Sequence, residues 1–379
     1  MRSLATSLPP PPPPTEEHGR HCAAVLLLST GSLIVAPTRL RGYLTSGLGR
    51  LGHTAAVEGL QDFIDRYFHC EMAAKEDAHK PAKRRKTDLD SREKQIPELK
   101  KSSVFMRDRG RVEEIIRNMH GAGPGALQVI SDFDMTLTRF AYNGNRCPTS
   151  HGILENSSLI SEDCKAKLSN LFSRYYPSEI DNSLSEKSKV DDMVEWWTQA
   201  HELLVQQQIK KDQLAKAVRE SDAMLRDGYE VFFGSLKDHS IPLLIFSAGV
   251  GDILEEVIKH NGVFHPNVRV FSNYMEFDEN GVLCSFKEQL IHTFNKILDP
   301  DQCEQLQDRP NILLLGDSMG DLKMADKIRN IQNILRIGYL NDKVEERRDA
   351  YVGSYDIVLE KDETLDIPNA ILNYITGGK

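Results

Sequence analysis

Six short apolar segments in the part of the chain after residue 125 constrain its fold more than any other feature. Segments this short and this apolar are typical of parallel strands that are buried on both faces. Polar or turn-forming residues end each of them, and helical patterns separate several of them. The segments are Leu127–Asp132, Pro242–Gly249, Val268–Asn273, Asn311–Ser318, Ile334–Tyr339 and Tyr355–Glu360. This alternation predicts an α/β fold with an open parallel sheet and helices on both faces.

The predicted helices also have recognisable limits. Arg111–Gly123 has helical spacing and closes on a glycine, which is a common way for a helix to end. Helical patterns also follow two of the strands, in Gly251–Gly262 and Gly320–Ile328.

One interval is too long for the simple alternation. About a hundred residues with mostly helical patterns lie between the first and second predicted strands, although a crossover needs only about a dozen. We therefore predict a helical cap inserted at residues 141–235. The core domain would then consist of residues 96–140 and 236–379.

Residues 1–95 differ in composition from the rest, and we predict a low-order N-terminal extension. Pro9–Pro14 is an unbroken proline run, which favours an exposed polyproline II conformation. The basic cluster Lys80–Lys86 is either a nuclear-import signal or part of a solvated linker. Residues 55–68 have the pattern of an amphipathic helix. The apolar segment Cys22–Pro37 is shorter than the ~20 residues that cross a bilayer; it is either a signal peptide or an uncleaved segment.

Charge and cysteine content exclude some classes of protein. The net charge of −9 argues against general nucleic-acid binding. The six cysteines include no CxxC pair, which argues against a zinc ribbon or a disulfide scaffold and fits a reducing compartment. We expect a cytoplasmic monomer that binds neither nucleic acid nor membranes.

Acidic residues follow two of the predicted strands, and they predict the chemistry. Asp132 and Asp134 follow the first strand, Ser247 lies at the end of the second, and Asp317 and Asp321 follow the fourth. Ligands collect beyond the carboxyl ends of parallel strands, so these side chains should converge. Carboxylates that lie this close repel each other unless a cation neutralises them, and Mg²⁺ prefers oxygen ligands.

Together these residue types suit phosphoryl transfer. Asp132 could attack phosphorus, and Asp134, two positions later, could protonate the leaving oxygen and then activate water. Asp132 and Asp317 would hold Mg²⁺. Ser247 and Lys287, which lies in the long connection before the fourth strand, would bind the remaining phosphoryl oxygens. Asp321 either binds the ion or holds Asp317 or Lys287 in place.

The same residues carry a family resemblance. Asp132–Thr136 ("DFDMT") is similar to the DxDxT motif of haloacid-dehalogenase-like phosphatases, and "GDSMGD" (Gly316–Asp321) to their acidic motif. Residues 97–375 resemble the cytosolic 5′-nucleotidase III group, notably in "MVEWWTQAH" and "FSAGVGDILEEVI". The resemblance implies a Rossmann-like core with a helical cap and magnesium-dependent hydrolysis of nucleoside 5′-monophosphates. It also implies that the Asp134 backbone carbonyl binds the metal and that Ala248 contacts the phosphate.

That group has two branches, which differ in the nucleotide they prefer. Trp197 and Ala200 resemble the branch that accepts 7-methylguanosine 5′-monophosphate and CMP, rather than the pyrimidine branch. A methylated, cationic guanine stacks well on an electron-rich ring, worth about 0.5–2 kcal/mol per contact. We predict that Trp197 and Phe140 bind the base from its two faces and that Glu179 accepts its hydrogen bonds; the role of Glu179 is implied by the resemblance. Helical spacing alone would place Trp197 in the core, and Trp196 is expected to pack.

Two other functions stay open from the sequence. The chain could be a pyrimidine 5′-nucleotidase for CMP and UMP that also transfers phosphate to nucleosides. It could also be a non-catalytic nucleotide sensor acting through its N-terminal extension, although a complete set of catalytic side chains speaks against this.

Overall fold

The computed structural model describes residues 96–181, 184–287, 290–298 and 309–378, together with the two short strands β1 (Leu26–Leu27) and β2 (Leu33–Ile34). β1 and β2 pair antiparallel. The predictions for the proline run, the basic cluster and the helix at residues 55–68 lie outside the described residues. Within the part of the chain that the structure describes, no helix is long and apolar enough to cross a membrane.

A seven-stranded sheet forms the core, with the order β3-β13-β12-β11-β4-β7-β8. All neighbouring strands are parallel except β3, which pairs antiparallel with β13. The six predicted strands are confirmed, and the edge strand β3 is an addition. The strands are β3 (Val104–Phe105), β4 (Leu127–Ser131), β7 (Leu243–Val250), β8 (Val268–Asn273), β11 (Asn311–Gly316), β12 (Asn333–Leu340) and β13 (Ile357–Glu360).

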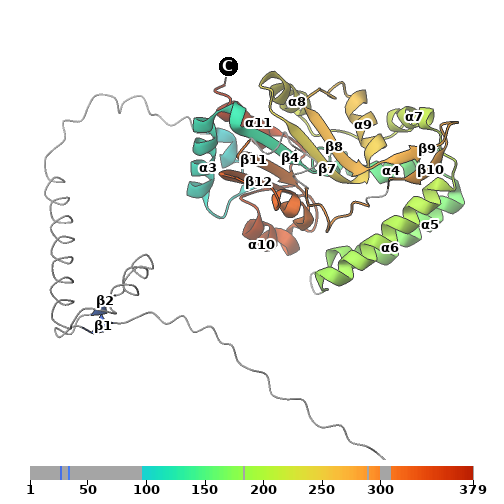
Figure 1. Cartoon of the computed structure of the whole chain (residues 1–379), viewed down its shortest axis with the longest axis horizontal. Helices are drawn as coiled ribbons and strands as arrows, with labels where there is room; N and C mark the ends of the chain where they lie inside the picture. The colour runs from blue at the N-terminus through green and yellow to red at the C-terminus, as the bar shows by residue number, and fades with distance from the viewer. Residues whose placement is uncertain are drawn as a thin grey trace, which may run out of the picture. The chain divides into compact units, whose positions relative to one another are not determined.

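Helices cover both faces of this sheet because its strands are apolar on both sides (Figure 1). In β7, Leu243 and Ile245 pack with one set of helices, whereas Leu244 and Phe246 join a second cluster on the opposite face. The first face carries α3 (Arg109–Ala122), α8 (Tyr229–Asp238), α9 (Gly251–His260) and α11 (Asp366–Ile375). The second carries the 3₁₀ helix η8 (Met319–Ala325) and α10 (Val344–Ser354).

The limits of α3 follow from its sequence. The Asp108 side chain accepts a hydrogen bond from the Arg111 backbone N–H (2.9 Å) and caps the first turn. Gly123, with φ 79°, follows the last residue, a conformation that glycine adopts without steric cost. The predicted helix is therefore confirmed. The pattern in Gly320–Ile328 instead forms the shorter 3₁₀ helix η8.

Between β4 and β7 the chain forms a hairpin and a helical insertion. The hairpin strands are β5 (Ala141–Tyr142) and β6 (Asn145–Arg146). The long helices α5 and α6 pack against each other and extend away from the sheet (Figure 1). The helices of the insertion are α4 (Ser150–Asn156), α5 (Glu162–Ile180), α6 (Glu186–Val205), the 3₁₀ helix η5 (Lys211–Gln213) and α7 (Leu214–Arg219).

The packing of α8 bears on the far limit of this insertion. The helical pattern at residues 210–239 divides into η5, α7 and α8, and α8 packs against α11 of the core. We therefore propose that the cap ends before Tyr229 rather than at residue 235. A second hairpin, β9 (Met275–Phe277) with β10 (Leu283–Phe286), contacts α6 from the core side.

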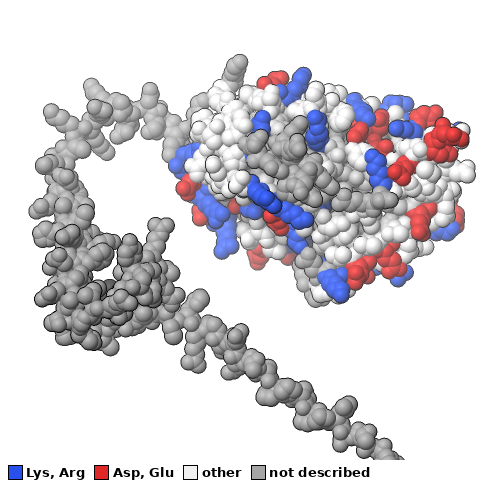
Figure 2. Space-filling model, in the orientation of Figure 1, with Lys and Arg blue, Asp and Glu red and all other residues white. Residues whose placement is uncertain are grey.

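Lys and Arg side chains alternate with Asp and Glu over the face of residues 96–378 that Figure 2 presents. A mixed surface of this kind gives no extended field of one sign. It is compatible with the prediction that the protein does not bind nucleic acid, which stays a prediction.

Candidate active site

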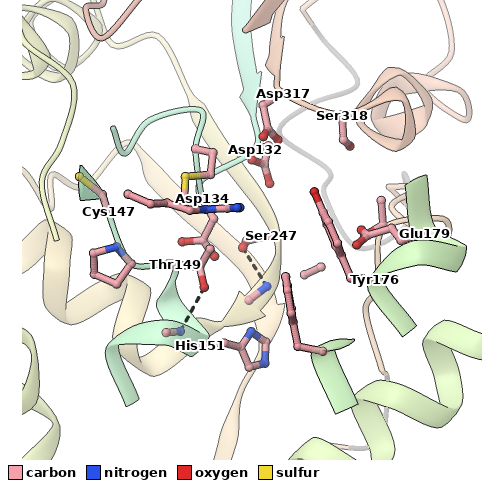
Figure 3. Close-up of a pocket in the computed structure, with 18 of the residues that line it drawn as sticks. Asp132, Asp134, Cys147, Thr149, His151, Tyr176, Glu179, Ser247, Asp317 and Ser318 are labelled. Carbon is pink, nitrogen blue, oxygen red and sulfur yellow. Dashed lines mark hydrogen bonds between the residues drawn. The ribbon is translucent and has the colours of Figure 1, made fainter. Parts of the chain in front are cut away.

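Register between two central strands brings the first acidic residues together. In the pairing of β4 with β11, Ser131 lies opposite Leu315, so the residues that follow each strand emerge at the same edge of the sheet. The Asp132 backbone N–H continues the ladder by donating to the Leu315 carbonyl at 3.0 Å. The Asp132 and Asp317 side chains point toward one another (Figure 3). Asp132 is only 3% exposed.

Asp134 lies beside this pair and is fixed by the start of α4. One of its carboxylate oxygens accepts a hydrogen bond from the Ser150 backbone N–H (2.8 Å), and the other accepts one from the Ser150 hydroxyl (2.7 Å). Gly249 makes this approach possible, because a Cβ there would lie 1.9 Å from Ser150 Oγ and 2.7 Å from Asp134 Oδ2. The segment at the end of β7 therefore has to lack a side chain for Asp134 to be held in this way.

A buried lysine joins the acidic residues, and it is not the one predicted. The Lys296 amine binds the carboxylates of Asp132 and Asp321, the latter at 2.8 Å. The second Asp321 oxygen accepts hydrogen bonds from the backbone N–H groups of Asp317 (3.1 Å) and Ser318 (2.9 Å). Asp321 thus holds both the lysine and the loop that carries Asp317, which is one of the two roles that the sequence left open.

The prediction that Lys287 binds phosphate is wrong. Lys287 is exposed, lies directly after the β9–β10 hairpin, and places its amine 5.0 Å from the centre of the Tyr274 ring. The hairpin takes up the residues that the sequence interpretation assigned to a simple connection. The chain therefore returns to the site nine positions later, at Lys296. One signal was available: Lys296 lies in the mostly apolar "FNKIL", whereas Lys287 is followed by glutamate.

Burial and mutual repulsion perturb the acids strongly. Burial, together with the nearby Asp321, raises the pKa of Asp132 to about 7, although Lys296 opposes the shift. Burial and the charges of Asp132 and Asp321 raise the pKa of Asp317 well above its usual value. Burial also raises the pKa of Asp134, with the Ser150 hydrogen bonds acting in the opposite direction. Burial alone would lower the pKa of Lys296, but its two carboxylate partners raise it overall.

The charge of the cluster fits a divalent cation. Carboxylate oxygens of Asp132, Asp317 and Asp321 lie within 4.8 Å of one another. Lys296 binds Asp132 and Asp321, so when all three acids are ionised three negative charges face its one positive charge. A cation of charge two would restore neutrality. Both Asp321 oxygens already have partners, which leaves Asp132 and Asp317 as the carboxylates that could hold the ion.

The acids open into a pocket of about 1450 Å³ between the sheet edge and the cap. Ser247 and Ala248, the two residues at the end of β7 that we expect to contact phosphate, line this pocket. The buried Ser247 hydroxyl accepts a hydrogen bond from the Gly249 N–H at 3.0 Å, so its own proton remains to be donated. No other residue accepts it among the contacts that the structure describes.

Cap helices line the other wall of this pocket. Tyr176 and Glu179 of α5 lie on one side of the acids, and Cys147 and Thr149 lie on the other (Figure 3). A Glu179 carboxylate oxygen accepts a hydrogen bond from the Thr293 hydroxyl (2.6 Å) of the core loop that carries Lys296. Burial raises the pKa of Glu179, against the effect of this bond.

Trp197 also lines the pocket, whereas Phe140 does not. The Trp197 indole N–H donates to the Ala248 carbonyl at 2.9 Å, which ties α6 to the end of β7. Phe140 is absent from the pocket lining in the described residues; its ring faces Arg146 instead, 5.0 Å away. The prediction of Phe140 as a base-binding ring is therefore wrong, because its ring packs against Arg146 of the β5–β6 hairpin. Trp196 was expected only to pack, and it lines the pocket while packing against Trp197.

Several residues of the site have no counterpart in the sequence prediction. His151, Phe294 and Lys296 line the pocket, and Ser150 at the start of α4 binds Asp134 beside it. Apart from the apolar setting of Lys296, no spacing pattern marks these positions, since each reaches the site only through tertiary packing.

A parallel α/β core with this acidic cluster at its strand ends, covered by an inserted helical cap, defines a haloacid-dehalogenase-like phosphatase. Within that class the chain belongs to the pyrimidine 5′-nucleotidase family (UMPH-1), which residues 135–376 match.

Named relatives agree with this assignment. The mouse 7-methylguanosine phosphate-specific 5′-nucleotidase is 58% identical over 287 residues, covering 74% of this chain and 95% of the relative. The Drosophila melanogaster protein of the same name is 36% identical over 286 residues, covering 74% and 89%. A solved structure of cytosolic 5′-nucleotidase IIIB bound to cytidine shares 35% identity with a TM-score of 0.67, covering 74% of this chain and 96% of that one.

Proposed function

We propose that this chain is a Mg²⁺-dependent 5′-nucleotidase that hydrolyses 7-methylguanosine 5′-monophosphate, and also CMP, to the nucleoside and phosphate. One observation carries the proposal: Asp132, Asp317 and Lys296 converge at the strand ends in a pocket whose other wall holds Glu179 and Trp197. The first group is suited to a phosphoryl group and the second to a base.

Each side chain at the strand ends has a role in this proposal. Asp132 attacks phosphorus and forms an aspartyl-phosphate, while the leaving O5′ takes a proton from Asp134. Water then attacks the aspartyl-phosphate and gives its proton to Asp134, which releases phosphate and restores both acids. Lys296, Ser247 and the backbone at Ala248 bind phosphoryl oxygens. A divalent ion held by Asp132, Asp317 and the Asp134 backbone carbonyl would neutralise the charge gathered there.

The raised pKa of Asp134 supports its part in this chemistry, because a carboxyl group must be protonated before it can donate. Ser150 binds both of its oxygens and fixes its direction. The orientation is thus set before substrate arrives, which reduces the entropy lost in reaching the reactive geometry.

Trp197 and Glu179 support a cationic purine as the preferred base. A ring face attracts positive charge, and N7-methylation gives guanine such a charge. The Glu179 carboxylate would accept hydrogen bonds from the guanine N1 and N2 hydrogens and adds to this preference. Tyr176 lies next to Glu179 (Figure 3) and replaces Phe140 as a candidate for a second ring at the base.

A pyrimidine nucleotidase that acts on CMP and UMP, and passes phosphate to nucleosides, is the second candidate. The cytidine bound to the solved relative favours it. We also propose a cytoplasmic location, supported by relatives and neighbours described as cytosolic. A monomeric state remains a prediction.

A panel of nucleoside 5′-monophosphates tests the proposal on the full chain, with Mg²⁺ and with a chelator. We expect kcat/KM for the methylated guanosine nucleotide to exceed that for GMP, and phosphate release to stop with chelator. Equal values for the two guanine nucleotides would contradict the role of base charge. Preference for UMP, with phosphate transfer to added nucleoside, would favour the second candidate. Turnover that persists in chelator would contradict the metal.

A further inference from the structure

A completely buried arginine lies where the chain returns from the cap to the core. Arg226 is 0% exposed and follows Leu225, which forms a bridge with Thr138 on the outgoing segment. The Arg226 backbone N–H donates to the Leu137 carbonyl, and the Arg139 N–H donates to the Met224 carbonyl, both at 2.9 Å. The segment that leaves the core for the cap and the segment that returns from it therefore run side by side, directly after the turn at residues 134–137.

Every N–H group of the Arg226 guanidinium has a partner, and two of these partners belong to the turn after Asp134. Nε donates to the Thr136 carbonyl at 2.8 Å, and Nη2 donates to the Met135 carbonyl at 2.6 Å. The other three N–H groups reach the Asp362 carbonyl, the Glu363 carboxylate and the Asn341 side-chain oxygen. A guanidinium has five donors in a fixed plane, so it fixes these groups relative to one another.

Glu363 pairs with Arg226 and binds the backbone at the other end of the same segment. Its carboxylate pairs with Arg226 at 3.2 Å and accepts hydrogen bonds from the backbone N–H groups of Phe140 (3.0 Å) and Ala141 (3.1 Å). The ion pair therefore binds carbonyls at the start of the segment and amides at its end. The Tyr339 ring, 4.0 Å from the guanidinium carbon, covers one face of the charge.

The backbone held in this way is strained. Met135 has φ 62°, a left-handed conformation that costs a non-glycine residue about 1–2 kcal/mol. Its carbonyl accepts two hydrogen bonds, from Arg226 and from the Asn341 amide (2.9 Å). These bonds offset the strain and fix the Met135–Thr136 peptide, one residue beyond Asp134. Without them we expect Met135 to relax and to shift the Asp134 backbone, which would pull the carboxylate away from its two Ser150 hydrogen bonds.

We propose that Arg226 is a positioning residue for proton transfer: it fixes the turn that aims Asp134 at the leaving oxygen. Arg226 itself lies in the segment by which the chain returns from the cap to the core. The inference rests on the proposed role of Asp134 as proton donor. Burying an unneutralised arginine is costly. Here the Arg226 charge is paired with Glu363, and its hydrogen bonds fix the backbone after Asp134 rather than contribute to apolar packing.

Leaving groups of different basicity separate this role from a merely structural one. p-Nitrophenolate leaves phosphorus without a proton, whereas the O5′ of a nucleoside needs one. The experiment compares kcat/KM for CMP with kcat/KM for p-nitrophenyl phosphate in the full-length Arg226→Lys variant, which keeps the charge and loses the planar fork. This parameter covers the steps up to loss of the leaving group, so it excludes the later hydrolysis of the aspartyl-phosphate, in which Asp134 accepts a proton with either substrate. We expect kcat/KM to fall about 10- to 100-fold for CMP and less than about 3-fold for p-nitrophenyl phosphate, because general acids contribute about 10²- to 10⁴-fold.

Asn341→Ala provides a second, milder variant, since it removes the other donor to the Met135 carbonyl; it decides the matter if Arg226→Lys does not fold. Arg309→Lys is the matched control. Arg309 also donates to backbone carbonyls, those of Pro124, Leu127 and Ser240, at the opposite end of β4. We expect the ratio of the two activities to stay at the wild-type value in that control.

The outcomes distinguish this inference from the function on which it rests. A substrate-dependent loss in Arg226→Lys or Asn341→Ala, absent from Arg309→Lys, supports the positioning role. Equal losses on both substrates, or no loss, overturn it. If Asp134→Asn itself lowers kcat/KM equally for the two substrates, or wild-type protein releases no phosphate from CMP, the proposed function fails instead.

Discussion

The strand ends and the cap wall of the same pocket are built from different kinds of side chain. At the strand ends, four charged residues (Asp132, Lys296, Asp317 and Asp321) contact one another or lie close together, and the backbone ladder of the sheet fixes the first of them. On the cap wall, the charge of Glu179 stands among aromatic rings. Two hydrogen bonds from this wall reach the core, Glu179–Thr293 and Trp197–Ala248.

This difference indicates a division of labour. Parallel strands place short acidic side chains with little freedom, which suits a reaction that depends on charge and on fixed distances. Helices on an insertion place large rings that can be exchanged without disturbing the sheet. We therefore expect variants at the strand ends to change the rate on all substrates, and variants on the cap wall to change the ratio between substrates.

Asp132→Asn should have the largest effect. Loss of the nucleophile removes the covalent step, so kcat should fall at least about 10³-fold on every substrate, as in other enzymes that lose a nucleophile. Phosphate release from CMP and from p-nitrophenyl phosphate measures this. The change substitutes an isosteric amide for a buried acid, so a thermal melt should show a folded protein. Substantial remaining activity on either substrate would assign the nucleophile elsewhere.

Lys296→Met should come next, with Lys287→Met as its matched control. Lys296 is the buried cation at the phosphate end, so its loss should lower kcat/KM about 10²- to 10³-fold, comparable to removing one transition-state donor. Lys287 is exposed beyond the β9–β10 hairpin, and its variant should stay near wild type. A larger loss in Lys287→Met than in Lys296→Met would reverse the correction made from the structure.

Trp197→Leu should have a smaller and selective effect. If the indole carries the cation–π contact, kcat/KM for the methylated guanosine nucleotide should fall about 2- to 30-fold relative to GMP. Hydrolysis of p-nitrophenyl phosphate, which has no base, should change little. Trp196→Leu shows which of the two pocket indoles matters. If either tryptophan variant lowered all activities together, the distinction between the two walls would not hold.

The smallest expected effect is on the pH dependence of the free energy of unfolding, through the buried His201 of cap helix α6. Burial lowers the pKa of His201 to about 3, so below the ordinary value of about 6.5 the unfolded chain binds a proton that the folded chain does not. Stability is therefore lost as pH falls below that value. His201→Phe should lose about 1 kcal/mol less than wild type between pH 7 and 5.5 in urea unfolding. Identical pH dependence in wild type and His201→Phe would contradict this account.

Much of the core was predictable because its signals are local. The apolar segments that became β4, β7 and β11 are continuous, and parallel pairing then forces Asp132, Ser247 and Asp317 to one edge. The edge strand β3 escaped notice because two residues, Val104 and Phe105, carry too short a pattern.

What the sequence could not specify depends on the path of loops. Lys287 and Lys296 lie in the same connection, and only the β9–β10 hairpin decides which of them reaches the acids. Phe140 and Trp197 are both aromatic and both near predicted site segments, yet the Phe140 ring lies against Arg146 of the β5–β6 hairpin and only Trp197 lines the pocket among the described residues. The contacts of Arg226 span segments more than a hundred residues apart, and no periodicity records such a contact.

The bond from the Trp197 indole to the Ala248 carbonyl has a consequence for how the protein can tell one ligand from another. That bond uses the side chain's one polar hydrogen, so nothing remains on the ring to match the edge of an incoming heterocycle. Discrimination at this position must work through the electron density above and below the indole plane. The side chain can therefore distinguish an electron-poor heterocycle from an electron-rich one, but not the pattern of donors and acceptors along the edge of the ligand.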